Sequence, residues 1–323
     1  MTAKTTFDTL VTVYGGSGFL GRHVVRALAR RGYRIRVAVR RPELAGHLQP
    51  LGRVGQIHAV QTNVRYAPSV EAAARDAHVL VNLVGILSER GRQRFDAVQT
   101  YGAEQVALAA NAHGARLVHV SAIGADEDSS SHYARSKAAA ERLVHTAQPD
   151  AVIMRPSIVF GPEDDFFNRF ASLARMAPAL PLIGGGHTRF QPVFVGDVAA
   201  AIAQAVDGNA RAGTIYELGG PDIKTFKELM AYVLATIDRK RLLVPLPFAL
   251  AKFQASILQY LPTPPLTPDQ VELLRSDNVV SDAAAREQRT LQALGITPET
   301  TAAIVPSYLY RFRRTGQFGG HVA

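Results

Sequence analysis

The sequence predicts an α/β fold: a doubly wound parallel sheet followed by a smaller C-terminal α/β domain. Short apolar runs typical of strands alternate with segments of helical spacing through residue 155. A glycine-rich turn joins the first strand to the first helix, as in sheets that bind nucleotides at their carboxyl edge. With 47% apolar and 20% charged residues, the chain has the composition of a globular protein.

The first half of the chain is expected to supply the sheet. Alternating apolar residues mark its strands, and glycines mark the ends of its helices. We expect strands at 10–14, 34–40, 56–60, 78–83, 116–121 and 151–155, and helices at 20–31, 95–112 and 133–148.

Beyond residue 155, prolines and glycines interrupt this alternation of strands and helices. A capping box of Thr225 and Glu228 opens a predicted helix at 226–237. We therefore place a nucleotide-binding domain at 1–160 and a smaller lid or docking domain at 161–323. The remaining predicted elements are a helix at 197–206 and strands near 189–195 and 214–218, which are candidates for a return to the first core.

Charge and composition narrow the possible functions. The net charge is +9, and the first 60 residues hold ten Lys or Arg against two Asp or Glu. Such an excess favours an anionic partner: a phosphorylated cofactor, an acidic protein or a membrane surface. The chain has no cysteine, which excludes disulfides, thiolate catalysis and thiolate metal ligands. Its ten histidines show no paired spacing, so we expect no metal site.

No secretory signal or transmembrane helix is expected. The apolar run 242–251 is ten residues long and contains two prolines, whereas a spanning helix needs about 20 apolar residues. The apolar segment 248–261 and the tail 308–314, where aromatic residues alternate with arginines, suit docking on a membrane surface or a large partner. The alternative is packing on their own domain. Nucleic-acid binding is not expected, because no recognition motif accompanies the tail.

The turn after the first strand reads G-G-S-G-F-L-G. Glycine lets the backbone approach a pyrophosphate closely, and the following helix presents free N–H groups at its positive end. The turn therefore predicts dinucleotide binding. The expected contacts are Gly15, Ser17, Gly18, Phe19, Leu20 and Gly21.

The second predicted strand ends at Arg40 and Arg41. An NAD site usually places a carboxylate here, on the ribose 2′-hydroxyl. Two guanidinium groups suit a 2′-phosphate instead, so the sequence favours NADP or NADPH. The alternative is that both arginines are merely solvated.

Ser121 ends the fifth predicted strand, and Tyr133 and Lys137 follow four residues apart on one face of the next predicted helix. A lysine charge near a phenol lowers the pKa of that phenol. The tyrosine could then exchange a proton with a substrate oxygen that the serine orients. These three are the candidate catalytic residues. The alternative for this spacing is an exposed tyrosine and a solvated lysine.

Together with the segment R-P-S-I-V-F-G-P at 155–162, these motifs resemble the extended and atypical short-chain dehydrogenase/reductase superfamily. The resemblance covers residues 8–220 and implies that Ser121, Tyr133 and Lys137 also contact the cofactor. Two motifs depart from the family: T-N-V after the third strand, where many members have an aspartate, and N-L-V-G after the fourth, where N-x-A-G is usual. The further contacts that the resemblance implies are Asn63, Val64, Leu83, Val84, Gly85, Pro156, Ser157 and Ile158.

Within that superfamily the chain is most similar to the Rossmann-type accessory subunits of respiratory complex I. The similarity lies in V-Y-G-G-S-G-F-L-G, V-A-V-R-R-P, Y-A-R-S-K and M-R-P-S-I-V-F-G-P-E-D. It implies a subunit of NADH:ubiquinone oxidoreductase that holds NADPH as a mainly structural cofactor and has other complex I subunits as partners. Its implied location is peripheral, on the cytoplasmic face of the inner membrane or on the matrix side in mitochondria. The alternatives are a free NADPH-dependent reductase or epimerase that uses the three candidate catalytic residues, and a nucleotide-sensing regulator.

Overall fold

The computed structural model describes residues 6–261, 264, 266–314 and 316. It divides into two compact units. The first contains Met1–Pro156, Gly196–Leu218 and Asp282–Ile296, and the second contains Ser157–Val195, Gly219–Ser281 and Thr297–Ala323.

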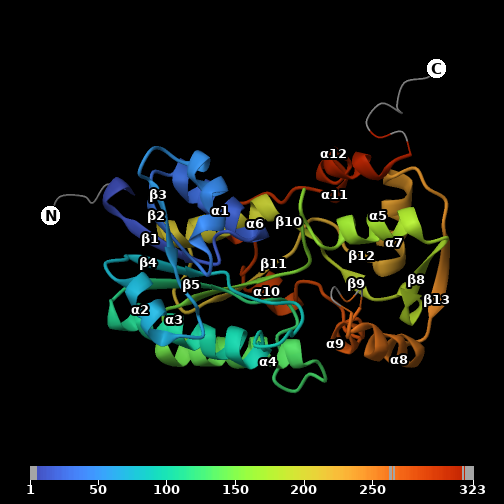
Figure 1. Ribbon diagram of the computed structural model, residues 1–323, viewed down its shortest axis with the longest axis horizontal. Helices are drawn as coiled ribbons and strands as arrows, with labels where there is room; N and C mark the ends of the chain where they lie inside the picture. Colours follow the sequence, from blue (N-terminus) through green and yellow to red (C-terminus); the bar gives the residue numbers. More distant parts are fainter. Residues whose placement is uncertain (1–5, 262–263, 265, 315, 317–323) are drawn as a thin grey trace. The chain divides into compact units, whose positions relative to one another are not determined.

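The first unit is built on a seven-stranded sheet with the order β11-β6-β5-β4-β1-β2-β3 (Figure 1). Every neighbouring pair in it is parallel, which confirms the predicted doubly wound fold. The central strands are continuous apolar runs because both of their faces are covered. The strands are β1 (Leu10–Tyr14), β2 (Arg34–Val39), β3 (Ile57–Gln61), β4 (Val79–Asn82), β5 (Arg116–Val120), β6 (Val152–Pro156) and β11 (Ile215–Leu218).

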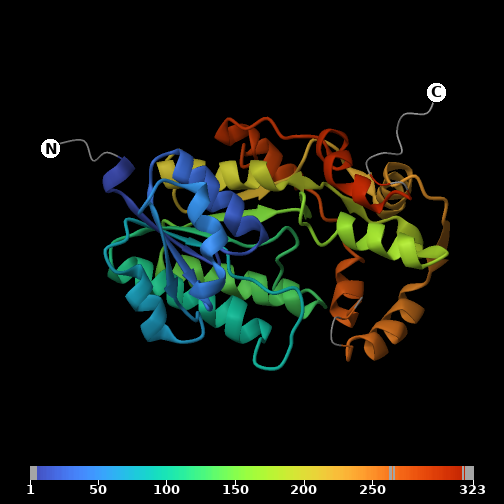
Figure 2. The same ribbon diagram turned by 45° about the horizontal axis from the view of Figure 1, so that its top comes forward.

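Helices cover both faces of this sheet. Figures 1 and 2 show α2, α3 and α4 on one face and α1 and α6 on the other. On the first face, Val106 and Val144 pack with Leu80, Leu117 and Ile153 of the sheet in one buried cluster. The helices are α1 (Phe19–Arg30), α2 (Ala67–Ala74), α3 (Tyr101–Ala112), α4 (His132–Ala147), α6 (Val195–Asp207) and the short α10 (Asp282–Arg286).

The second unit has an aromatic core in which Phe160, Phe167, Phe190 and Phe226 are buried. Its three small sheets pair β7 (Val159–Phe160) with β10 (Val193–Phe194), β9 (Arg189–Phe190) with β12 (Lys224–Thr225), and β8 (Ala179–Ile183) with β13 (Leu242–Leu246). Its helices are α5 (Phe167–Met176), α7 (Phe226–Thr236), α8 (Phe248–Leu258), α9 (Pro268–Leu273), α11 (Thr301–Ile304) and α12 (Pro306–Leu309). None of the helices described in either unit is long and apolar enough to cross a membrane.

Several elements differ in detail from the sequence-based expectation. The strand expected at 189–195 is two short strands, because Pro192 between them lacks the N–H that a ladder requires. Both pair inside the second unit, whereas the strand expected at 214–218 is β11 of the main sheet. The helix expected at 95–112 begins with a π-helical turn, Asp96–Thr100, before α3.

The aromatic tail packs on its own unit. Tyr308, Leu309 and Phe312 are buried in the core of the second unit. The Tyr308 hydroxyl donates to Asp164 Oδ2 at 2.5 Å. The structure therefore supports packing of Tyr308–Phe312 on its own unit, and not the docking role that the alternating aromatic residues and arginines suggested. Thr315 and the residues from Gln317 onward lie outside the described residues.

Candidate functional site

The glycine turn lies between the end of β1 and the start of α1. Gly15 has φ 80°, a conformation that favours glycine. A Cβ on Gly21 would lie 2.4 Å from the Gly15 carbonyl oxygen, so the turn closes on the helix only because this side chain is absent. Gly18 caps α1 without a side-chain hydrogen bond, and the first turn holds no acidic residue. The N–H groups of that turn are therefore available to an anion.

The turn contacts the two neighbouring strand ends. The Gly15 N–H donates to the Ala38 carbonyl in β2 at 3.0 Å. A Cβ on Gly15 would lie 3.3 Å from the Leu83 carbonyl carbon, just beyond β4. Arg40 and Arg41 follow β2 directly, and both are exposed. The structure thus brings the arginines, the glycine turn and the end of β4 to one edge of the sheet.

Asn63 and Val64 follow β3 at the same edge. The Asn63 side-chain oxygen accepts from the Arg65 backbone N–H at 3.1 Å, and Gly102 of α3 leaves room for the Val64 side chain. The predicted contact of Asn63 with the cofactor therefore depends on its amide nitrogen, since the side-chain oxygen already accepts from Arg65.

Asn82 shapes the turn after β4. Its side-chain oxygen accepts from the Val84 N–H at 3.1 Å, and its amide nitrogen lies 3.2 Å from His119 Nδ1. Burial, reinforced by the nearby charge of Lys137, lowers the pKa of His119 to about 3. His119 is therefore neutral and acts as a structural partner of this turn.

The three candidate catalytic residues come together at the end of β5. Lys137 Nζ donates to the carbonyl of Val120 at 3.2 Å, one residue before Ser121, and lies 5.9 Å from the Tyr133 ring centroid. Ser121 is buried, and its hydroxyl has no partner among the described residues. A buried serine hydroxyl can orient a substrate oxygen, and a tyrosine beside a lysine can exchange a proton with that oxygen.

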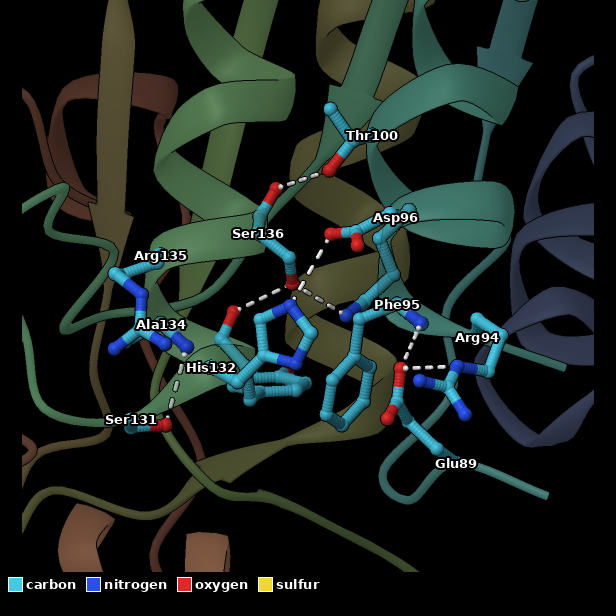
Figure 3. A network of polar contacts seen from close by, with 12 residues as sticks. Glu89, Arg94, Phe95, Asp96, Thr100, Ser131, His132, Ala134, Arg135 and Ser136 are labelled. Carbon is cyan, nitrogen blue, oxygen red and sulfur yellow. Dashed lines mark hydrogen bonds and ion pairs between the residues drawn. The ribbon is translucent and has the colours of Figure 1, made fainter.

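A polar network fixes the start of α4, which carries Tyr133 and Lys137. Figure 3 shows Ser136 bonded to the π-helical turn: Gln99 Nε2 donates to its hydroxyl at 2.9 Å and Thr100 Oγ1 donates to its carbonyl at 3.2 Å. The Ser136 hydroxyl in turn donates to the Tyr133 carbonyl at 2.8 Å. The rings of Phe95 and Tyr133 pack in a T-shaped arrangement with centroids 5.8 Å apart. No pattern in the sequence predicts this network.

Arg155, Glu141 and Glu217 form a buried ion-pair cluster that no sequence pattern indicates. Arg155 Nε and Nη2 contact the two carboxylate oxygens of Glu141 at 2.9 and 2.5 Å. Glu217 Oε1 lies 3.7 Å from the same guanidinium. The cluster joins α4, β6 and β11, the elements that flank the candidate catalytic residues.

The segment Pro156–Ile158 is held by backbone and amide contacts. The Pro156 carbonyl accepts from the Ile123 N–H at 3.0 Å. In the second unit, the Ser157 hydroxyl donates to Asn278 Oδ1 at 2.7 Å, and the Ile158 N–H donates to the same oxygen at 3.1 Å. Asn278 therefore engages the polar groups of both residues, and their contact with a cofactor stays a prediction. No group of three or more His, Cys, Asp or Glu within the described ranges is placed to hold a metal.

Lys137→Met should stabilise the nucleotide-free protein at pH 7 by roughly 3 kcal/mol. Burial, partly offset by Glu141, lowers the pKa of Lys137 from 10.5 to about 8. The folded state therefore carries the full desolvation cost below pH 8. Between pH 8 and 10.5 the unfolded state binds more protons, so wild-type stability should rise with pH there. Urea unfolding at pH 7 and 9.5 measures both effects.

The exposed Lys227 provides the control. Lys227→Met should leave stability and its pH dependence unchanged. A Lys137→Met protein less stable than wild type at pH 7 would contradict a desolvated ammonium.

Comparisons with known proteins show which family the sequence resembles. Residues 11–219 match the NAD dependent epimerase/dehydratase family. The chain is 37% identical to a protein of Arabidopsis thaliana named NADH dehydrogenase (ubiquinone) 1 alpha subcomplex subunit 9, mitochondrial, over 97% of this chain and 81% of that protein. It is also 37% identical to a ceramide reductase of Caulobacter vibrioides, over 60% of this chain and 59% of the reductase. An NADPH-dependent quinone oxidoreductase of Escherichia coli, solved with NADPH, superimposes with a TM-score of 0.72 at 20% identity over 93% of this chain and 99% of that one. This last similarity shows the fold alone.

Proposed function

We propose that this chain, which belongs to the NAD dependent epimerase/dehydratase family, is an accessory subunit of an NADH:ubiquinone oxidoreductase and holds NADPH as a mainly structural cofactor. The observation that carries this proposal is the extent of the similarity. The family match ends at residue 219, whereas the similarity to the mitochondrial subunit covers 97% of the chain and so includes most of the second unit.

The first unit fits a dinucleotide phosphate. Its glycine turn leaves a cradle that a Cβ at Gly21 would fill, and the α1 N-terminus offers uncapped N–H groups. Arg40 and Arg41 stand exposed at the end of the neighbouring strand, where a 2′-phosphate would require cations. A ligand that binds only the folded state stabilises it by mass action, and this stabilisation is the structural role we assign to NADPH.

We further propose that the second unit meets an anionic membrane surface, on the cytoplasmic side of a bacterial inner membrane or the matrix side of a mitochondrial one. Helix α8 buries Ala251 and Ala255 but exposes 46%, 64% and 59% of Leu250, Phe253 and Ile257 on its other face. The segment 239–261, which contains β13 and α8, has four Lys or Arg and no Asp or Glu. Apolar side chains flanked by cations favour the interface of a membrane with anionic lipids.

The convergence of Ser121, Tyr133 and Lys137 supports a second function, a free NADPH-dependent reductase. The unpartnered buried hydroxyl of Ser121 is the specific observation in its favour. Steady NADPH oxidation that is lost in Tyr133→Phe would support this alternative over a structural cofactor.

Arg40→Asp should weaken NADPH binding at least tenfold, since charge-assisted hydrogen bonds contribute about 1.5–3 kcal/mol, and should leave NADH binding within twofold. Isothermal titration of the nucleotide-free chain with each nucleotide measures this. Arg34→Asp is the matched control, because Arg34 is also exposed but begins β2 at the opposite edge of the sheet. Full occupancy of the purified protein by NAD or NADH, or unchanged NADPH affinity in Arg40→Asp, would contradict the cofactor assignment.

A further inference from the structure

Cationic side chains from three separate segments of the second unit come together near Phe312. Arg239 Nε donates to the Phe312 carbonyl at 3.0 Å, and the Arg175 guanidinium lies 5.9 Å from the centroid of the Phe312 ring. Arg313 Nε donates to the Thr236 carbonyl at 2.9 Å. We call this group the cationic cluster, and its members are Arg175, Arg239, Lys240, Arg241, Arg313 and Arg314.

No carboxylate balances the cationic cluster. Within the described residues, none of its members forms an ion pair. Asp238, the only acidic residue from 229 to 268, is not paired with any of them. Burial and the charges of three other members lower the pKa of the Arg239 guanidinium. Because like charges held together repel one another, an anion bound here would stabilise the folded protein.

The arginines of the cluster are held in place by helix ends. Arg241 Nε donates to the Ala174 carbonyl in the last turn of α5 at 2.8 Å, and Arg313 bonds the last residue of α7. Carbonyls at these positions lack a partner within the helix. Arg239 and Arg313 use only Nε in their bonds, whereas a guanidinium has five N–H groups to donate. Their remaining N–H groups are therefore available to an anion.

Exposed apolar side chains adjoin the cluster. Met176, next to Arg175, is 78% exposed, and Leu242, next to Arg241, is 71% exposed. The Leu242 N–H donates to the Pro178 carbonyl at 3.3 Å, which brings both side chains to the same part of the unit. A guanidinium matches the oxygens of a phosphate in geometry and charge. An anionic phospholipid supplies a phosphate and hydrocarbon together, whereas an acidic protein surface would supply no apolar partner for these two side chains.

We infer that the cationic cluster binds the phosphate of an anionic phospholipid headgroup, with Met176 and Leu242 at the boundary of the hydrocarbon. The inference rests on the proposed membrane contact of the second unit and adds to it a headgroup site outside α8. Strand β13 begins directly after Arg241 and ends two residues before α8. Leu242 and Val244 are exposed on one side of this strand, so apolar side chains continue from the cluster toward α8.

The test is co-sedimentation of the full chain with vesicles of phosphatidylcholine alone or mixed with phosphatidylglycerol. The cluster variant combines Arg175→Gln, Lys240→Gln and Arg314→Gln, which are exposed positions, and it leaves the three hydrogen bonds to backbone carbonyls intact. The control variant changes three exposed arginines of the first unit and removes the same net charge: Arg26→Gln, Arg30→Gln and Arg34→Gln. Thermal unfolding checks that both variants are folded.

We expect the wild type and the control variant to bind the anionic vesicles equally, and both to bind them more weakly as salt is added. The cluster variant should bind at least about tenfold more weakly, since each cation near an anionic membrane contributes about fivefold. All three proteins should bind neutral vesicles equally. If the cluster variant does not fold, Lys240→Gln alone should weaken binding to anionic vesicles about fivefold.

Two results would overturn the inference: equal binding of anionic vesicles by the cluster and control variants, or no preference of the wild type for anionic over neutral vesicles. Inorganic phosphate and soluble polyglutamate test the other sources of negative charge. A rise in Tm that depends on the cluster and is larger with either of these than with anionic vesicles would also contradict a lipid site.

Phe253→Ser, on the exposed face of α8, separates this inference from the proposed membrane contact. Vesicle binding that is lost in Phe253→Ser but unchanged in the cluster variant would overturn the headgroup site alone. A wild-type chain that binds neither kind of vesicle would overturn the proposed membrane contact as well.

Discussion

Gly21→Ala is expected to abolish NADPH retention and to lower the free energy of unfolding of the nucleotide-free protein by about 3 kcal/mol. The added Cβ would lie 2.4 Å from the Gly15 oxygen and 2.6 Å from the backbone of Gly16. These are backbone atoms at the point where the turn meets α1. The clash therefore cannot be relieved by the movement of a flexible side chain. The turn must open, and the N–H groups that would hold the pyrophosphate are displaced with it.

The matched control is Gly46→Ala. A Cβ on Gly46 meets nothing within 4 Å, and the backbone there is compatible with alanine. This variant should keep wild-type stability and nucleotide content. Nucleotide released on denaturation and thermal unfolding report the two properties separately. A Gly21→Ala protein that retains full nucleotide would show that the turn is not the phosphate site.

Arg155→Met is expected to destabilise the first unit by about 3–5 kcal/mol, the cost of leaving buried charge uncompensated. The Glu141 side chain is 6% exposed and that of Glu217 is 10% exposed, and both face the guanidinium. Without the cation, two carboxylates remain close together in a poorly hydrated space. Acidification, which protonates carboxylates, should recover part of the lost stability.

The surface pair of Arg142 and Glu127 gives the control. It has a similar geometry at 2.9 Å, but both side chains are more than half exposed. Arg142→Met should cost less than about 0.5 kcal/mol, as surface ion pairs do. Urea unfolding at pH 7 and pH 5 measures both variants. Equal, small losses in the two would mean that the Arg155 cluster is hydrated and carries little stability.

The sheet and the glycine turn could be predicted because their signals are local. Each central strand is a short apolar run, such as the buried Val79–Asn82. The turn is recognised from the spacing of its glycines. Helix α2, by contrast, was not predicted. Its core contacts come from Val70, Ala73 and Ala74 only, and three small residues make a weak periodic pattern.

The rest of the site depends on residues that are distant in sequence. In the sequence, Gln99 is an ordinary polar residue of a predicted helix. Only the folded structure shows that it lies beside Ser136 of α4. In the sequence, Arg155 is only the first residue of the R-P-S-I-V-F-G-P motif. Its ion pair with Glu217 of β11 forms only in the folded structure. The burial of Tyr308 depends likewise on Asp164. The periodicity of apolar residues along the chain cannot predict which side chains of two distant elements form a hydrogen bond or an ion pair.

Native affinity purification of the full chain, from membranes solubilised in mild detergent, tests the proposed role as a complex I subunit most directly. We expect the chain to be recovered with subunits of an NADH:ubiquinone oxidoreductase, and the denatured complex to release NADP or NADPH in proportion to the chain. Recovery of the free chain alone, with none of those subunits, would contradict that role and favour the reductase.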